Sequence, residues 1–288
     1  MAASQLTLRA QIYGQNIMQL AQQKYSKLMP AVYVKGEGIN GKTFFQDQIG
    51  KWSMEANGGL NVDSPNNDPN FSRRMATMVT YHDARLIDRS IQLQILSDPK
   101  APSTIAAGAS IGRQIDSVII EAATGTAHYG ETGSSSQALE SPQIIADGGT
   151  NLTFAKVKTA KRKLDDQDVE EEDRYFVTSP AGLEKLLGSV EATSADYNTV
   201  KALVRGEIDT WMGFKWIKST LLSVASNIRT CFAFQKTGIC VGMSEAPMVR
   251  VDDLPGKSYS TQIYYELNIA AVRLEEAKVV KVDIDETK

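Results

Sequence analysis

Hydrophobic residues recur at helical spacing near the start of the chain, with glutamines and lysines between them. This pattern predicts an amphipathic helix over residues 6–28, which ends before Pro30. A single helix with one apolar stripe has to bury that stripe against its own chain or against a neighbour. The residues of the stripe are Tyr13, Ile17, Leu20, Ala21 and Leu28.

Residues 31–80 combine short apolar stretches with segments rich in glycine, asparagine, proline and aspartate, which favour turns. Val32 and Val34 predict a short strand. The following apolar residues roughly alternate, which predicts a long two-stranded excursion. Such a hairpin is only marginally stable alone and needs a surface to lie on. Its apolar residues are Phe44, Phe45, Ile49, Trp52 and Met54.

A long helix is expected in the next part of the chain. Residues 76–96 mix strand and helix signals, and either Asp98 with Pro99 or Ser103 can begin the helix. It should run to Thr124 and end at Gly125. Gly108 and Gly112 lower its intrinsic stability, so packing must hold it. Its apolar face carries Ile105, Ala109, Ile115, Ile119 and Ala122.

The remainder predicts an α+β arrangement. Residues 126–152 look like a loop with one apolar pair, Ile144 and Ile145, and the last third is rich in strands. The expected elements are helices at 154–164, 179–188 and 197–204, a strand at 175–177, a hairpin over 231–242 turning near Thr237 and Gly238, two strands around Pro255 and Gly256 within 247–272, and a final strand at 278–284.

Composition is that of an ordinary globular protein. The chain has 288 residues, of which 42% are hydrophobic and 23% charged, enough for a real core. The net charge of −3 gives no sign of a protein that binds nucleic acid by neutralising phosphates. Cys231 and Cys240 fit a reducing compartment and a core position. We see neither a signal peptide nor an apolar run of about 20 residues, so we expect a soluble chain made in the cytoplasm, without membrane contact.

One motif matches a phosphate-binding loop letter for letter. Gly36, Gly41, Lys42 and Thr43 follow the pattern G-x-x-x-x-G-K-[ST], which works when the loop opens a helix whose amides hold phosphates. The segment after Thr43 is a poor helix, and no convincing strand further on supplies an aspartate for magnesium. A nucleotide hydrolase therefore remains an alternative whose required structural context is mostly missing.

Other chemical features have simpler explanations. Residues 165–173 carry an acidic run that could bind a hard cation, form a solvated loop, or contact a basic neighbouring subunit. His82 and His128 are isolated, which argues against zinc. Trp211, Phe214 and Trp216 fit core packing. We predict no catalytic, cofactor-binding or metal-binding residue. The acidic residues are Asp165, Asp166, Asp168, Glu170, Glu171, Glu172 and Asp173.

Three segments resemble parts of tailed-bacteriophage major capsid proteins. Residues 160–187 resemble that family's helix, short acidic loop, arginine, buried strand, proline and second helix. Residues 201–222 resemble its element of a leucine, a glycine and then G-F, here Leu203, Gly206, Gly213 and Phe214. Residues 41–59 resemble its extended loop, where a G-K-[ST] often opens a strand. The resemblance covers about residues 30–284.

The resemblance implies an α+β fold of the Hong Kong 97 type and a protein that assembles into an icosahedral shell around double-stranded DNA, without sequence specificity. The partners it implies are other copies, in pentamers and hexamers, together with scaffolding and portal proteins. An encapsulin-like protein compartment shares the fold and stays an alternative. No large segment precedes the arm, which implies a separate scaffold or a removed segment. The expected divisions are an N-terminal arm (1–35), an extended loop (36–80), a spine helix with peripheral domain (81–128), an axial domain (129–242), a peripheral hairpin (243–268) and return strands (269–288).

Overall fold

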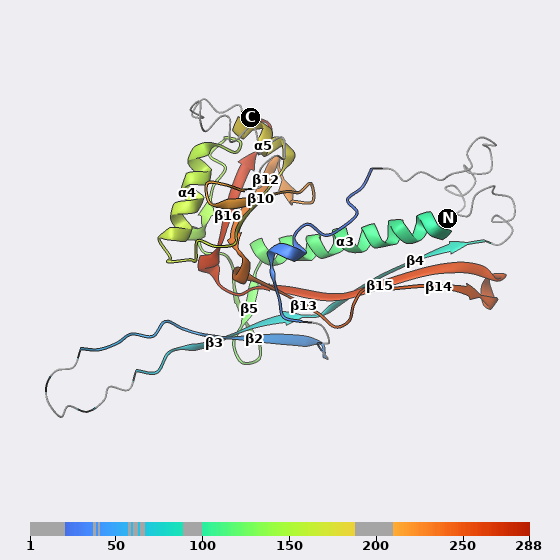
Figure 1. Cartoon of the computed structure of the whole chain (residues 1–288), viewed down its shortest axis with the longest axis horizontal. Helices are drawn as coiled ribbons and strands as arrows, with labels where there is room; N and C mark the ends of the chain where they lie inside the picture. Colours follow the sequence, from blue (N-terminus) through green and yellow to red (C-terminus); the bar gives the residue numbers. More distant parts are fainter. Residues whose placement is uncertain are drawn as a thin grey trace.

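The computed structural model describes residues 21–36, 39, 41–56, 59, 63, 67–88, 100–187 and 210–288. Within these residues the chain builds three β-sheets and the helices α3 (Lys100–Thr124), α4 (Phe154–Asp165) and α5 (Pro180–Leu187). Figure 1 shows a domain with α4 and α5 at one end, an elongated body along α3, and a hairpin that projects from the body. This arrangement is α+β, as the sequence predicts.

The seven-stranded sheet forms the domain that carries α4 and α5. Its core contains aromatic rings, and the Phe176 and Trp216 rings stack with centroids 4.5 Å apart. Trp211 and Phe214 are also buried there, which confirms their packing role. In order, the strands are β7 (Ile144–Ile145), β16 (Val279–Asp285), β12 (Ile228–Gln235), β8 (Arg174–Thr178), β10 (Phe214–Lys218) and β9 (Thr210–Trp211), with β11 (Val224–Ala225) paired to β12.

The elongated body is a sheet organised around one long strand, β15 (Ser260–Arg273). Helix α3 lies along this strand (Figure 1), and Leu267 and Ile269 share a hydrophobic cluster with Ile115 and Ile119 of the helix. This contact supplies the packing that the glycine-containing helix needs. The other strands are β1 (Tyr33–Val34), β13 (Ile239–Met243) and β14 (Met248–Leu254), and β4 (Val79–Ile87) pairs with the opposite edge of β15.

The projecting hairpin consists of β2 (Thr43–Ile49) and β3 (Phe71–Thr77), which confirms the predicted excursion. Two short strands, β5 (Ala127–Tyr129) and β6 (Ser135–Gln137), extend this sheet beyond β3. The segment 126–152, expected to be a loop, therefore contains three short strands, β5, β6 and β7. The 3₁₀ turns are η1 (Met29–Ala31), η2 (Ser141–Gln143), η3 (Lys236–Gly238), η4 (Pro255–Lys257) and η5 (Glu276–Lys278).

The predicted N-terminal helix is wrong over residues 21–28, which contain no helix, while residues 6–20 lie outside the described part. The physical reason is a competing acceptor. The Asp116 carboxylate of α3 accepts the backbone N–H groups of Lys27 and Leu28. In a helix those groups would bond to carbonyls four residues earlier. The expected helix at 197–204 also lies outside the described residues.

The expected hairpin over 231–242 is wrong as well, although both of its strands exist. Strands β12 and β13 are not paired; they enter different sheets, and η3 is the crossing between them. Because β13 and most of β12 are buried, each strand needs partners along its own edges. Strand β12 pairs with β8 and β16, whereas β13 pairs with β1 and β15.

Candidate assembly surfaces

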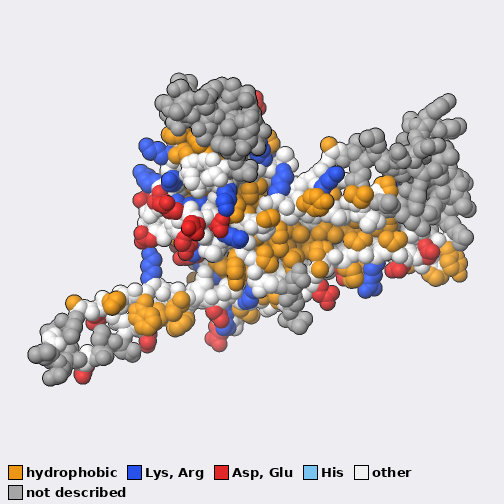
Figure 2. Space-filling model, viewed as in Figure 1, with side chains coloured by type: hydrophobic (Ala, Val, Ile, Leu, Met, Phe, Trp, Pro, Cys, Tyr) orange, Lys and Arg blue, Asp and Glu red, His pale blue; other side chains and the backbone are white. Residues whose placement is uncertain are grey.

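Large apolar side chains are exposed along the outer part of the projecting hairpin. Ile49 and Phe71 face each other across the strands and are 61% and 77% exposed. Beyond them Trp52 is 71% exposed and Met54 almost fully so. Figure 2 shows hydrophobic side chains gathered on the surface of the projecting hairpin. Exposed apolar groups gathered in this way mark an interaction site.

The same face of the hairpin carries an ion pair. Arg73 Nε lies 2.5 Å from Asp47 Oδ1, and the guanidinium stacks over the Phe45 ring at 5.4 Å. The hydrogen bond from Arg73 lowers the pKa of the Asp47 carboxyl. Beside this pair a groove of about 820 Å³ runs between β3 and the β5–β6 turn, lined by Asp47, Phe71, Ser72, Arg73, Tyr129, Gly130 and Glu131.

The base of the hairpin, by contrast, is fixed. Phe44, Ala76 and Met78 form a small hydrophobic cluster with Cys240 of β13, with Ala270 and Val272 of β15, and with Leu274, which follows β15. The hairpin is thus anchored at one end and exposed at the other, which suits an element that must reach another molecule with a defined direction.

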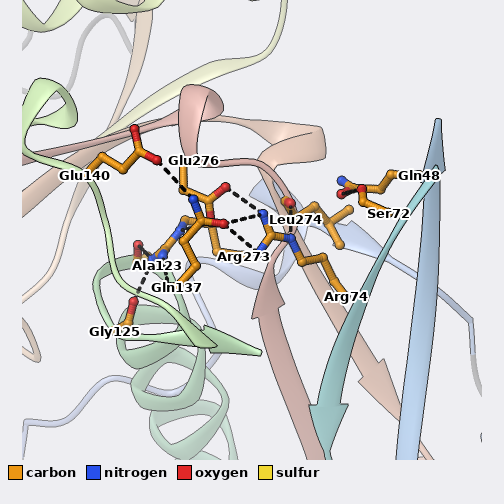
Figure 3. A network of polar contacts seen from close by, with 10 residues as sticks. All are labelled: Gln48, Ser72, Arg74, Ala123, Gly125, Gln137, Glu140, Arg273, Leu274 and Glu276. Atoms are coloured by element: carbon orange, nitrogen blue, oxygen red, sulfur yellow. Dashed lines mark hydrogen bonds and ion pairs between the residues drawn. The ribbon is translucent and has the colours of Figure 1, made fainter. Parts of the chain in front are cut away.

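A buried polar network reinforces this base (Figure 3). Arg74 of β3 donates to the Leu274 carbonyl at 2.8 Å and to Glu276 Oε2 at 2.6 Å. Glu276 is also 3.6 Å from Nε of Arg273, which is fully buried. One carboxylate therefore lies between two guanidinium groups, one from the hairpin and one from β15.

Arg273 joins this network to the end of α3. Its Nη1 donates to the carbonyls of Ala123 at 3.2 Å and Gly125 at 2.7 Å, and its Nη2 to that of Gln137 at 3.1 Å. A cation at the C-terminus of a helix satisfies free carbonyls and interacts favourably with the helix dipole. Burial lowers the pKa of this guanidinium, whereas Glu276 raises it.

Sequence reasoning missed this network. A signal was present, because Arg273 stands between Val272 and Leu274 in an otherwise apolar run, where a charge must find partners. Most partners in this network are far apart in the chain: Arg74 is 200 residues from Leu274, and Arg273 is 136 residues from Gln137. Such pairs cannot be read from local spacing.

The phosphate-loop hypothesis is contradicted by local structure. Gly36 and Gly41 have positive φ angles of 106° and 125°, which explains the glycines as turn residues. Thr43 begins strand β2, so the loop opens a strand and not a helix. The Lys42 side chain is exposed, and its carbonyl accepts the Met78 N–H within the hairpin sheet. The helix N-terminus that would hold phosphates is absent from this described segment.

The acidic run is largely paired with basic side chains of the same chain. Asp165 contacts Arg174 at 2.5 Å and Asp173 contacts Lys215 at 2.6 Å, which lowers the pKa of Asp173. Asp168 lies 3.6 Å from Lys51, which follows strand β2. Over the described residues no group of three or more acidic, histidine or cysteine side chains is arranged to hold a metal. The remaining pairs are Asp166 with Arg162 and Glu170 with Lys278.

The histidines and cysteines also lack a shared chemistry. His82 lies in β4 and His128 in β5, in different sheets. Both cysteines are buried free thiols, and burial raises the pKa of each to about 11. They are therefore protonated and shielded at neutral pH. No helix of the described part is both long and apolar enough to cross a lipid bilayer.

The comparisons with known proteins agree with the geometry. The sequence matches the family model described as phage capsid protein over residues 6–286, so the chain belongs to the phage capsid protein family. It is a structural protein of the virion capsid. No curated protein matches the sequence.

Solved phage structures share the fold at low sequence identity. The capsid of Ralstonia phage GP4 is 8% identical with a TM-score of 0.75, covering 96% of this chain and 95% of that one. A chain of Mycobacterium phage Che8 is 12% identical, with a TM-score of 0.71 and coverage of 96% and 97%. The capsid of cyanophage P-SCSP1u is 15% identical, with a TM-score of 0.71 and coverage of 94% and 91%. The expected Hong Kong 97-type fold is confirmed, and neither the hydrolase nor the encapsulin alternative is favoured.

Proposed function

We propose that this chain is the major capsid protein of a tailed bacteriophage and assembles, through pentamers and hexamers, into an icosahedral shell around double-stranded DNA. The observation that carries the proposal is the anchored hairpin whose outer apolar side chains its own subunit leaves exposed. Heterologous contacts between identical subunits close into rings. We further propose that the protein is not an enzyme and needs no cofactor.

We propose that successive segments of the chain form the separate structural parts of the capsid subunit. Residues 1–35 act as the arm, 36–80 as the extended loop, 81–128 with 243–268 as spine helix and peripheral domain, and 129–242 with 269–288 as the axial domain. The membership of β7 to β12 and β16 in one sheet supports the axial assignment. Because β13 pairs with β15 and not with the seven-stranded sheet, we move the two expected axial boundaries, from 242 to near Gln235 and from 269 to the start of β16.

We propose scaffolding and portal proteins as further partners, with assembly in the host cytoplasm. The packaged DNA would be held by confinement and not by sequence-specific contacts, because the net charge is −3. A protein that neutralised many phosphates would need a cationic surface.

We propose that the groove beside Phe71 and Tyr129 receives apolar side chains of a neighbouring copy.

Trp52→Ala should reduce shell yield far more than Lys42→Ala. Both side chains are exposed in the subunit, so neither change should unfold it. If a neighbour buries Trp52, truncation removes a large apolar anchor, worth about 3–5 kcal/mol for an aromatic group. An ion pair formed by an exposed lysine contributes only about 0.2–1 kcal/mol. Particle yield by sedimentation, with thermal unfolding of the subunits as control, checks this.

The same pair of variants tests the enzyme alternative. Titration of the wild type with ATP and magnesium should show no saturable binding, because the helix that a phosphate loop requires is replaced by β2. Micromolar ATP binding that disappears in Lys42→Ala would restore the hydrolase hypothesis, and equal shell yields for the two variants would refute the role of the hairpin.

A further inference from the structure

The carboxylate of Asp116 is fully buried in the middle of α3. Within the described part of the chain, its hydrogen-bond donors come from residues 23–28. Gln23 Nε2 lies 2.5 Å from Oδ2 and Ser26 Oγ lies 2.6 Å from Oδ1. The backbone N–H of Lys27 lies 3.1 Å from both oxygens, and that of Leu28 lies 3.1 Å from Oδ1. Among the described residues, the carboxylate is thus held by amide groups and a hydroxyl and not by a cation.

The helix surface beside Asp116 is shaped for the same segment. Gly112 lies one turn earlier, and a Cβ at this position would be 2.9 Å from the Ser26 nitrogen and 3.0 Å from the Tyr25 carbonyl carbon. The backbone of residues 25 and 26 therefore rests directly on the helix. Arg113 adds hydrogen bonds to Gln22 Oε1 at 2.9 Å and to the Gln23 carbonyl at 3.4 Å.

Apolar packing contributes little until the end of this segment. Lys24 is exposed and the Tyr25 side chain is 81% exposed, whereas Leu28 is fully buried. Lys27 Nζ reaches the Lys218 carbonyl at 2.8 Å, which links the segment to the seven-stranded sheet. Because a buried charge is unfavourable without its donors, the carboxylate and the segment stabilise each other. Loss of either partner should release the other.

We propose that Asp116 is a positioning residue that locks residues 22–28 onto α3 and so fixes the direction in which the N-terminal arm leaves the subunit. The second half of this statement rests on the proposed shell function, because a neighbour can receive the arm only if the arm leaves at a defined point. The first half concerns the single subunit and can be tested without assembly.

The lock is tested on unassembled subunits with Asp116→Asn, which removes the charge and keeps the size. The matched control is Glu121→Gln, the same chemical change at an exposed position of the same helix. Asp116→Asn should speed tryptic cleavage after Lys24 and Lys27 at least tenfold and speed hydrogen exchange of the Lys27 and Leu28 amides. Exchange in β12 and β16 should stay at wild-type rates, and the control should match the wild type throughout.

A double variant, Gln23→Ala with Ser26→Ala, keeps the test valid if Asp116→Asn folds poorly. It removes the two side-chain donors from the arm and leaves the helix intact, and it should also open residues 22–28 selectively. Cleavage and exchange at wild-type rates would overturn the lock. Equal acceleration in the segment and in β12 and β16 would overturn it too, because that pattern is general unfolding.

An assembly experiment tests whether Asp116 also fixes the direction in which the N-terminal arm leaves the subunit. Asp116→Asn subunits should give at least tenfold fewer closed shells than wild type, and Glu121→Gln should give wild-type yields. If residues 22–28 detach from α3 in Asp116→Asn and closed shells still form at wild-type yield, the contact with Asp116 does not direct the arm. If the wild type itself forms no shells under any condition, the proposed function fails, while the proteolysis and exchange results still decide the lock.

Discussion

Arg273→Met should lower the free energy of unfolding of the subunit by about 3–5 kcal/mol, because it removes one partner from a buried charged network. The guanidinium is fully buried and donates to the carbonyls of Ala123, Gly125 and Gln137. Methionine fills part of the space but cannot replace the hydrogen bonds that Arg273 donates to those carbonyls. Since a domain is stable by only about 5–15 kcal/mol, much of the variant should be insoluble.

The matched control is Arg250→Met, which makes the same substitution at an exposed arginine of β14. It should change the unfolding free energy by no more than about 0.5 kcal/mol. Denaturant unfolding of soluble subunits measures both. If Arg273→Met stayed within about 1 kcal/mol of wild type, the network could not be what fixes the hairpin, the end of α3 and β15 together.

Gly112→Ala should destabilise the subunit by about 1–3 kcal/mol, the usual range for forcing extra atoms into a packed site. The new methyl group would approach backbone atoms of Tyr25 and Ser26, which cannot move aside as a flexible side chain can. The displaced segment would also lose its hydrogen bonds to Asp116. This loss should exceed the gain in helix propensity from glycine to alanine.

Gly108→Ala is the control, because it makes the same change one turn earlier on the same helix, where no atom of the described residues lies within 4 Å of the new methyl group. Only the helix propensity remains, so this variant should gain about 0.5–1 kcal/mol. In thermal unfolding, Gly112→Ala should therefore lower the stability of the subunit, whereas Gly108→Ala should raise it. Two stabilised variants would mean that residues 25 and 26 do not lie against α3.

The sequence predicts those elements whose partners are close in the chain or whose pattern is long. Helix α3 (Lys100–Thr124) ends at Thr124 as expected, and the β2–β3 hairpin and the β14–β15 pair follow from alternation and turn residues. The failures share one cause. Residues 21–28 and the β12–β13 crossing are decided by partners far away in sequence, such as Asp116 and β15.

In the candidate site, too, features that depend on local sequence could be predicted, whereas features that depend on distant partners could not. The exposed residues of the hairpin, among them Trp52 and Met54, could be singled out because apolar groups stood among turn-forming residues that build no core. The G-K-T motif at Gly41–Thr43 was an exact match in letters, yet the conformation it requires is a loop that opens a helix, and the chain opens β2 there. That Arg74 and Arg273 are buried could be recognised only from the tertiary structure.

The central claim, that this chain builds a closed shell, is tested most directly by electron microscopy of the expressed protein, with its scaffolding protein if one is needed. We expect hollow closed particles built of pentamers and hexamers, in which the β2–β3 hairpin lies against a neighbouring subunit. A monodisperse monomer at high concentration, even with scaffold and a crowding agent, would contradict the account.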